Sequence, residues 1–142
     1  MITNSDLLRK TSLLRFILAC LFIYVSSVSV FAQRSTKDIN RVGDEYFNTQ
    51  QYYKATLYYQ ESLGINRKDV WANLQMGHCS RYLFQYPEAE HHYQRVVESS
   101  LRRYPEALYY FALVQKLNGK YDAAIENFAR FMAYYDNKES PF

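Results

Sequence analysis

The 142-residue sequence contains little glycine and proline, with four and three residues respectively. A fold made of many short strands needs such turn residues at close intervals, so their scarcity excludes a loop-rich all-β fold. Aromatic residues are abundant instead, because tyrosine occurs 15 times and phenylalanine 9 times. With 49% hydrophobic residues, a chain of this length is expected to form one domain with a substantial core.

Cysteine is also scarce, since the chain has only Cys20 and Cys79. Cys20 lies in an N-terminal leader, and removal of that leader would leave Cys79 without an intramolecular disulfide partner. Cys79 falls inside a predicted helix, where a small buried residue is the expected role. A reactive or intermolecular thiol is the alternative.

An excess of either charge is nearly absent outside the leader. The formal net charge of the whole chain is +3, but the leader contributes Arg9, Lys10 and Arg15 against Asp6. From Gln33 on, 14 basic and 13 acidic residues remain. This balance gives no general attraction to nucleic acid or anionic lipid, so we expect neither as a partner.

Residues 1–32 have the pattern of a secretory signal peptide. A basic segment ends at Arg15, the apolar run Phe16–Val30 follows, and Val30-Phe31-Ala32 offers small residues at the cleavage positions. We therefore expect cleavage between Ala32 and Gln33, and a protein exported to the periplasm or cell envelope.

Two other fates of the leader remain open. Ile17-Leu18-Ala19-Cys20 resembles a lipoprotein cleavage box, although the sequence after Cys20 stays apolar where a lipoprotein turns polar. The apolar run could also remain as an uncleaved anchor, although it is slightly shorter than the usual membrane span of about 20 residues.

One pattern of small and aromatic residues occurs three times in the rest of the chain. In each copy an alanine follows a small residue after 12 positions, and an aromatic residue follows that alanine after four. The copies are 34 and then 35 residues apart, and this period is typical of stacked helical hairpins. The frame positions are Gly43, Ala55 and Tyr59; Gly77, Ala89 and Tyr93; and Ala112, Ala124 and Phe128.

Apolar periodicity and helix-end signals predict an all-α fold with two helices in each copy. The expected helices span 37–49 and 52–64, 70–83 and 87–99, and 105–117 and 121–134. Asp69 is a candidate N-cap, Pro87 and Pro105 suit first helical turns, and Asn118-Gly119 suits a helix end. The organisation is a signal peptide (1–32), a tether (33–37), repeats over 36–69, 70–104 and 105–138, and a tail (139–142).

These small and aromatic positions resemble the tetratricopeptide repeat (TPR) over roughly residues 36 to 138. The resemblance implies three stacked hairpins in a short right-handed α-solenoid that acts as a protein–protein scaffold, not as an enzyme. The sequence departs from the family pattern at Arg67 and Leu101, where a loop proline is usual, and at Ser80 and Gln115, where a large aromatic residue is common.

In this family, partners bind the concave face, which is lined mainly by the first helix of each pair. The matching positions here are Lys37, Asn40, Asp44, Phe47 and Asn48; Trp71, Leu74, His78, Arg81 and Tyr82; and Glu106, Tyr109, Leu113, Lys116 and Leu117. The second and third sets are aromatic and apolar with a few charges, which suits an extended or helical peptide. Leu74 and Leu117 could instead pack between hairpins.

A chaperone-adaptor role is not expected. Family members of that class hold a carboxylate with lysine, asparagine and arginine side chains. The matching positions are Asn40, Asp44, Gln75, Glu106 and Tyr110, which include two acids.

Metal or cofactor chemistry is not expected either. Glu88, Glu90, His91 and His92 lie close together, but they are assigned to the solvated outer face of a second helix. Zinc sites usually need three or four converging ligands, and no phosphate loop or nucleophile elbow is present. The sequence thus predicts no metal, no cofactor and no small-molecule substrate; an enzyme on the same scaffold is the competing class.

The leader followed by a tyrosine-rich array resembles the N-terminal part of Bacteroidetes envelope proteins. These include the peptidoglycan-binding OmpA-like component of the type IX secretion machinery. The present chain stops at Phe142, so it is expected to act alone or as a fragment of a longer protein. Aromatic residues crowd the last hairpin without a polar capping helix after it, so self-association or partner docking is expected there.

Overall fold

The computed structural model describes residues 35–139, with side chains up to Asp136. Its six helices are α2 (Thr36–Asn48), α3 (Tyr52–Ile65), α4 (Val70–Tyr82), α5 (Tyr86–Ser100), α6 (Glu106–Leu117) and α7 (Tyr121–Glu139). No strand occurs among these residues, so the all-α prediction is confirmed for them. The predicted signal peptide and its cleavage site lie outside the described residues. Within 35–139, no helix combines the length and apolarity that crossing a bilayer requires.

Helices α2 to α6 begin and end within one residue of the predicted limits. The predicted tether is too long, because the Ser35 hydroxyl accepts a hydrogen bond from the backbone N–H of Asp38 and starts α2 at Thr36. The last helix is longer than predicted and continues past Tyr134 to Glu139. No glycine or proline occurs between Tyr121 and Glu139 to end it earlier.

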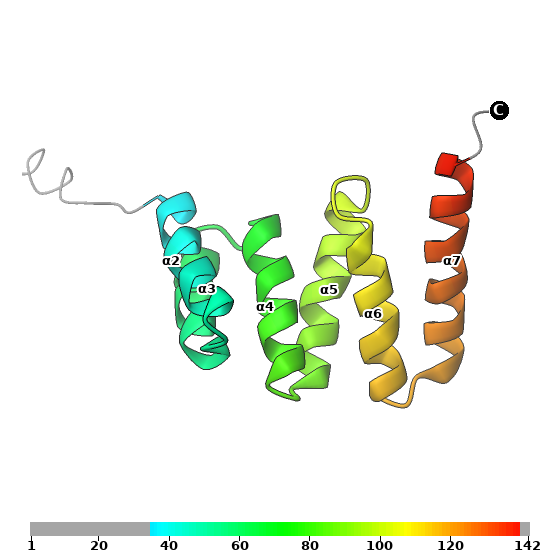
Figure 1. Cartoon of the computed structure of the whole chain (residues 1–142), viewed down its shortest axis with the longest axis horizontal. Coiled ribbons are helices and arrows are strands. Elements are labelled where there is room, and N and C mark those ends of the chain that lie inside the picture. Colours follow the sequence, from blue (N-terminus) through cyan, green and yellow to red (C-terminus); the bar gives the residue numbers. More distant parts are fainter. Residues whose placement is uncertain (1–34, 140–142) are drawn as a thin grey trace, which may run out of the picture. The chain divides into compact units, whose positions relative to one another are not determined.

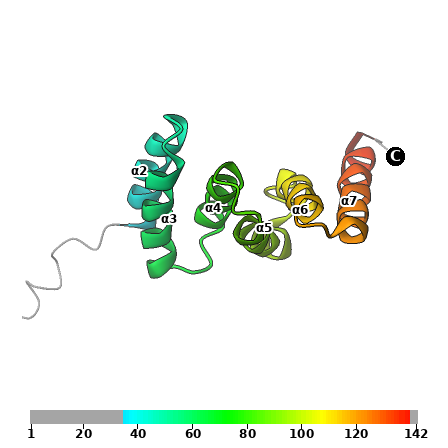
Figure 2. The same cartoon turned by 90° about the horizontal axis from the view of Figure 1, so that it is seen from below.

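The helices follow one another in chain order, each beside its predecessor (Figures 1 and 2). The hairpins are α2–α3, α4–α5 and α6–α7, and they join where α3 packs on α4 and α5 packs on α6. This arrangement corresponds to the three hairpins expected from the repeats.

The turn inside each hairpin has the same backbone conformation. Gln50, Phe84 and Gly119 all lie in the left-handed region, with φ angles of 60°, 62° and 78°. Each is followed by a residue whose N–H bonds back to the preceding helix, as Gln85 does to the carbonyl oxygen of Ser80 at 2.8 Å. The glycine expected to end a helix does so at 119, whereas the first two turns use residues for which this conformation is strained.

Two buried apolar clusters form the core. The first is centred on α3 and α4 and contains Ala55, Tyr59, Ala72, Met76 and Cys79. The second extends from α4 to α6 and contains Leu74, Ala89, Tyr93, Val96, Ala107, Leu108, Phe111 and Val114. Because α4 contributes to both clusters, it connects the first hairpin to the rest of the array.

The small residues of the repeat frame allow close helix packing in the first two hairpins. A Cβ atom added to Gly43 would lie 2.7 Å from the ring of Tyr59, and one added to Gly77 would lie 2.7 Å from the ring of Tyr93. Both distances are shorter than van der Waals contact, so the buried rings require glycine opposite them. In these two hairpins, the glycine and the aromatic residue of the frame are in contact, as the pattern predicts.

Asp69 links three helices as well as capping α4. Its carboxylate accepts the backbone N–H of Ala72 at 3.1 Å, which confirms the predicted N-cap. It also accepts the Asn40 side-chain amide of α2 at 2.9 Å and the Ser62 hydroxyl of α3 at 3.3 Å. One carboxylate therefore holds the start of α4 against the first hairpin.

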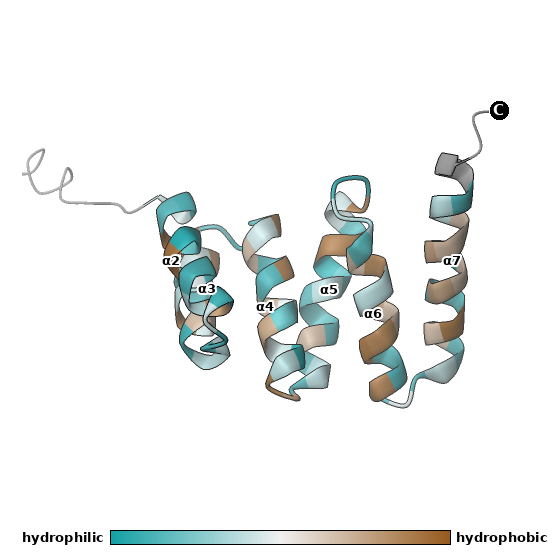
Figure 3. Ribbon diagram, viewed as in Figure 1, coloured by the Kyte–Doolittle hydropathy of each residue, from teal (hydrophilic) through white to brown (hydrophobic). Residues whose placement is uncertain are grey.

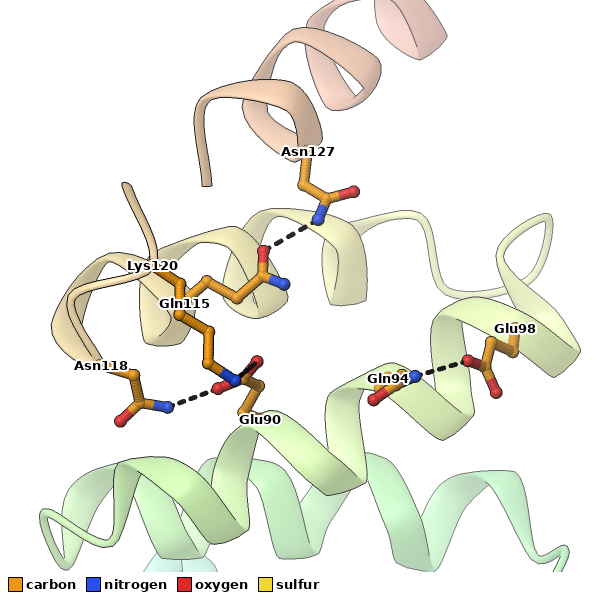
Figure 4. A network of polar contacts seen from close by, with 7 residues as sticks. All are labelled: Glu90, Gln94, Glu98, Gln115, Asn118, Lys120 and Asn127. Atoms are coloured by element: carbon orange, nitrogen blue, oxygen red, sulfur yellow. Dashed lines mark hydrogen bonds and ion pairs between the residues drawn. The ribbon is translucent and has the colours of Figure 1, made fainter. Parts of the chain in front are cut away.

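A polar network joins the second and third hairpins (Figure 4). The carboxylate of Glu90 accepts hydrogen bonds from Asn118 at 2.6 Å and from Lys120 at 2.8 Å, both in the turn between α6 and α7. Within the third hairpin, the Asn127 amide donates to Gln115 at 2.8 Å. The expectation that Glu90 faces solvent is wrong, because the next hairpin covers it.

Candidate functional site

The buried tyrosines of the repeat frame reach the exposed side of the neighbouring helix. The hydroxyl of Tyr59 donates to the Asp44 carboxylate at 2.6 Å, and the hydroxyl of Tyr93 lies 2.8 Å from Nδ1 of His78. Asp44 and His78 occupy the same repeat position, and in the third repeat the equivalents of His78 and Tyr93 are Leu113 and Phe128. Two of the binding positions expected on the first helices, Asp44 and His78, are therefore polar groups held by hydrogen bonds to buried tyrosines.

Trp71 borders an open hollow between the first two hairpins. Its indole N–H points at both oxygens of Asp44, at 3.1 and 3.2 Å, and its ring lies 6.2 Å from that of Tyr104. The hollow measures about 510 Å³, and its lining residues are Thr36, Lys37, Asp38, Asn40, Arg41, Asp44, Asp69, Trp71 and Arg103. Trp71 is thus held in place by a hydrogen bond while its half-buried ring still faces the hollow.

Two groups of aromatic side chains, one from the first two hairpins and one from α6, lie on either side of Arg81. We name them together the aromatic row, and its members are Phe47, Tyr52, Tyr82, Tyr110 and Tyr109. Tyr52 stacks on Tyr82 with ring centroids 4.4 Å apart, so α3 and α4 are joined by ring contact. Tyr82 and Tyr109 remain 42% and 40% exposed, which leaves apolar ring surface available to a partner.

Arg81 links the α4 and α6 parts of the aromatic row. Its guanidinium carbon lies 4.3 Å from the ring centre of Tyr82 and 5.2 Å from that of Tyr110. Each ring attracts the cation through its negative face. The Nε atom of Arg81 is buried without a hydrogen-bond partner in the structure. One cation thus lies against rings of both α4 and α6.

His78 is a neutral member of the site. Burial, followed by the charge of Arg81, lowers its pKa to about 4 from an ordinary value of 6.5. Its ring packs edge-on against Tyr110 at 4.8 Å and against Tyr93 at 5.4 Å. At neutral pH this position is therefore a hydrogen-bonding aromatic group, and the positive charge of the site is on Arg81.

The third hairpin extends the site with Tyr109, whose ring contacts Phe128 and Phe131 of α7. Lys116 and Leu117 are exposed near the end of α6, and Leu113 is half-buried. Leu74 does not belong to the surface: it is buried in the second core cluster beside Ala89 and Tyr93. Its assignment to the binding face is corrected, because its side chain fills the space between hairpins.

The histidines of α5 were expected to face solvent, and this is wrong for His92. Its ring is buried between α4 and α5, with Nδ1 3.0 Å from Asn73 and Nε2 3.1 Å from Glu88. His91 and Glu88 are exposed as expected. Within residues 35–139, no three histidine, cysteine or acidic side chains gather in a way that could hold a metal ion.

Cys79 lies in the first core cluster and is fully buried. Burial, followed by the charge of Asp44, raises the pKa of its thiol to about 12. A thiol that stays protonated in an apolar environment is a poor nucleophile. Of the two roles that the sequence leaves open, the structure matches the buried apolar one.

Neither a family model nor a curated relative matches the sequence. Among solved structures, the C-terminal TPR-containing domain of an FK506-binding protein from Plasmodium falciparum is 23% identical, with a TM-score of 0.65. That match covers 72% of this chain and 78% of that domain. The second TPR of Spaghetti (RPAP3), bound to the HSP90 peptide SRMEEVD, is 15% identical with a TM-score of 0.65. It covers 70% of this chain and 92% of that one.

A bacterial structure gives a similar match. The type III secretion translocator chaperone SycD of Yersinia enterocolitica, in an alternative dimer, is 16% identical with a TM-score of 0.66. The match covers 77% of this chain and 82% of SycD. Likeness at these identities concerns the fold, and it agrees with the repeat frame observed in the core. The described part of the chain has the fold of a tetratricopeptide repeat domain.

Proposed function

We propose that this protein is a scaffold that binds a segment of a partner protein along the aromatic row. The observation that supports this most is the exposed ring surface of Tyr82, which lies against Arg81, and of Tyr109, which lies against Tyr110. Aromatic and arginine side chains dominate the binding energy of protein interfaces because they bury a large area at a small loss of conformational freedom. An extended or helical peptide with apolar side chains at intervals suits this surface.

The partner segment should not depend on an acidic C-terminus. The Spaghetti structure contains an HSP90 peptide that ends in aspartate. In the present chain, Asp44 occupies one position of the expected clamp, and its carboxylate accepts hydrogen bonds from Tyr59 and Trp71, so it offers no donor to a second carboxylate. Gln75, at another position of the expected clamp, is buried. An apolar or aromatic segment is therefore the proposed ligand.

Crosslinking in the native cell, followed by mass spectrometry, tests this function. Partner capture by the wild-type chain should be lost in the Tyr82→Ala/Tyr109→Ala variant, while circular dichroism and melting remain close to wild type. The matched control is Tyr53→Ala/Leu57→Ala, which removes two exposed apolar side chains from a different hollow and should leave capture unchanged. Equal losses in both variants would point to general stickiness and contradict the proposal.

We further propose that the protein is exported and works in the periplasm or cell envelope. The basic and apolar leader before Gln33 supports this proposal, as does its resemblance to Bacteroidetes envelope proteins of secretion or peptidoglycan-associated complexes. The intact mass of the exported protein should correspond to an N-terminus at Gln33. A lipid on Cys20 would contradict cleavage at Gln33 and indicate a lipoprotein. A full-length chain extracted from membranes would contradict it and indicate an uncleaved anchor.

A further inference from the structure

The outer face of α7 bears an exposed apolar stripe. Tyr121, Ile125 and Met132 are 63%, 67% and 59% exposed, and their spacings of four and seven residues place them on one side of the helix. Among the described helices, α7 packs mainly on α6, against which Ala124 and Asn127 are buried. Figure 3 shows tan, apolar bands alternating with teal, hydrophilic ones along α7, whereas α2 is mostly teal.

The repeat register shows that this stripe is a packing surface elsewhere in the molecule. Ile125 corresponds to Glu90 of α5 and to Thr56 of α3, which are only 9% and 7% exposed. Phe128 is half-buried, whereas the equivalent Tyr93 and Tyr59 are completely buried. Helices α3 and α5 pack against the first helix of the following hairpin, and Glu90 is also bonded by the α6–α7 turn.

The two covering helices share one pattern at the contact. Helix α4 contributes Ala72, Met76 and Cys79 to its core cluster, and α6 contributes Ala107, Phe111 and Val114 at the same repeat positions. Each helix thus presents a small residue, a large apolar residue four positions later, and a small residue three positions after that. Helices α4 and α6 are therefore two examples of the kind of helix that fits the face equivalent to the outer face of α7.

The first helix of a second copy does not fit it. At the same positions α2 has Asp38, Val42 and Glu45, and both acids are exposed. Asp38 is bonded to Ser35 at 2.7 Å, and Glu45 is paired with Arg41 at 2.9 Å. Burying these carboxylates against Ile125 and Met132 would remove them from water without a partner on α7. Head-to-tail stacking of copies is therefore disfavoured.

We propose that the outer face of α7 is a docking site for one amphipathic helix of a partner polypeptide. The partner helix presents the small, large and small apolar residues that α4 and α6 present to the preceding hairpins. This site is separate from the aromatic row, so one chain can hold two segments at once. Self-association through the last hairpin, which the sequence also predicts, is the alternative for this face that the test must exclude.

The test uses two synthetic helical peptides with the purified protein. One has the sequence of α4 (Val70–Tyr82) and the other that of α2 (Thr36–Asn48). Both are stapled on the side away from the contact, because short helices are marginal in water. Fluorescence anisotropy should show saturable binding of the α4 peptide and none of the α2 peptide. Ile125→Glu and, independently, Met132→Glu should each weaken binding about tenfold or more, as expected for the loss of a buried apolar contact.

Two control variants locate the binding. Leu57→Glu places the same charge on an exposed leucine of α3 and should leave the affinity unchanged. Tyr82→Ala should also leave the affinity for the α4 peptide unchanged. A failure of the proposal for the aromatic row can therefore be distinguished from a failure of the proposal for α7. Equal binding of both peptides, no binding of the α4 peptide, or insensitivity to both α7 variants would overturn the proposal. A concentration-dependent dimer that Ile125→Glu dissociates would overturn it in favour of a second copy.

Discussion

The glycines at 43 and 77 show how single residues set the distance between helices. The Cβ atom of an alanine at Gly77 would meet the Tyr93 ring at 2.7 Å, and that ring is fully buried. We expect Gly77→Ala to lower the free energy of unfolding by about 1–3 kcal/mol, because the core has no room for the methyl group. Chemical denaturation followed by circular dichroism measures this change.

Gly64 provides the matched control, because it lies in α3 and has no atom within 4 Å of an added Cβ. There the intrinsic preference of alanine for helix should leave stability unchanged or raise it by up to about 1 kcal/mol. The double variant Gly77→Ala/Tyr93→Leu should lose less free energy of unfolding than the sum of the losses in the two single variants, because the smaller leucine leaves room for the methyl group. Similar changes at Gly64 and Gly77 would mean that the frame contact is absent.

His78 should make stability depend on pH. Its pKa is about 4 in the folded chain because of burial and the charge of Arg81, and close to its ordinary 6.5 when unfolded. Between these values the unfolded chain binds more protons, so the free energy of unfolding falls as the pH drops from 6.5 towards 4, by up to about 3 kcal/mol. Above pH 7 this contribution is fully present.

Replacing the histidine identifies its share of that pH dependence. In His78→Gln the slope of stability against pH between 4 and 6.5 should become shallower. Some slope should remain, because burial also lowers the pKa of His92. Denaturation curves measured across this range, with His91→Gln as the exposed control, make the comparison. An unchanged slope in His78→Gln would show that this ring titrates normally in the folded protein.

At the residue scale, the sequence predicted the contacts within the frame but not the hydrogen bonds that the frame tyrosines make. The shared period placed Gly77 and Tyr93 on facing helices, and they are in contact. The bond between Tyr93 and His78 depends on the direction in which each side chain points, and periodicity carries no information about that. Trp71 is expected at the binding face, and nothing in the sequence signals the hydrogen bond from its N–H to Asp44.

At the scale of elements, the shared turn conformation predicts a stabilising substitution. Phe84 has a φ of 62° and is 77% exposed, so it bears the strain of the left-handed region with little burial in return. Phe84→Gly should raise the free energy of unfolding by about 1 kcal/mol, because glycine adopts this conformation without strain. Phe84→Ala, which removes the ring but keeps a Cβ, should not. Thermal melts of the two variants compare them, and a gain with alanine equal to that with glycine would assign the effect to the ring.

Helix limits were predictable because their signals are local. Asp69 at the start of α4 and Gly119 after α6 act through neighbouring backbone groups. The burial of Glu90 was not predictable in this way, because Asn118 and Lys120 approach it from 28 and 30 residues away. The left-handed turns at Gln50 and Phe84 have no glycine to indicate them, but they precede Gly119 by two repeat periods and by one, and this register could have identified them.

For the described array of helices, stability should vary along the chain because each hairpin contacts only its neighbours. Helix α4 lies between the two core clusters and buries 8 of its 13 residues, whereas α2 buries 3 of 13. Helix α7 is covered mainly by α6 and exposes Ile125 and Met132. Opening α4 therefore breaks contacts on both sides, and opening α7 breaks contacts on one.

Hydrogen exchange followed by mass spectrometry should show this gradient directly. Amides of α4 should exchange most slowly, at rates close to those of global unfolding, while amides in the second half of α7 should exchange fastest among the helices. Binding of the α4 peptide should slow exchange in α7 and leave α2 unchanged, because a helix on the outer face of α7 gives it the second neighbour that α3 and α5 already have. Uniform exchange along all six helices would mean that the array unfolds as a single unit, and that α7 is stabilised as well as the interior helices without a further partner.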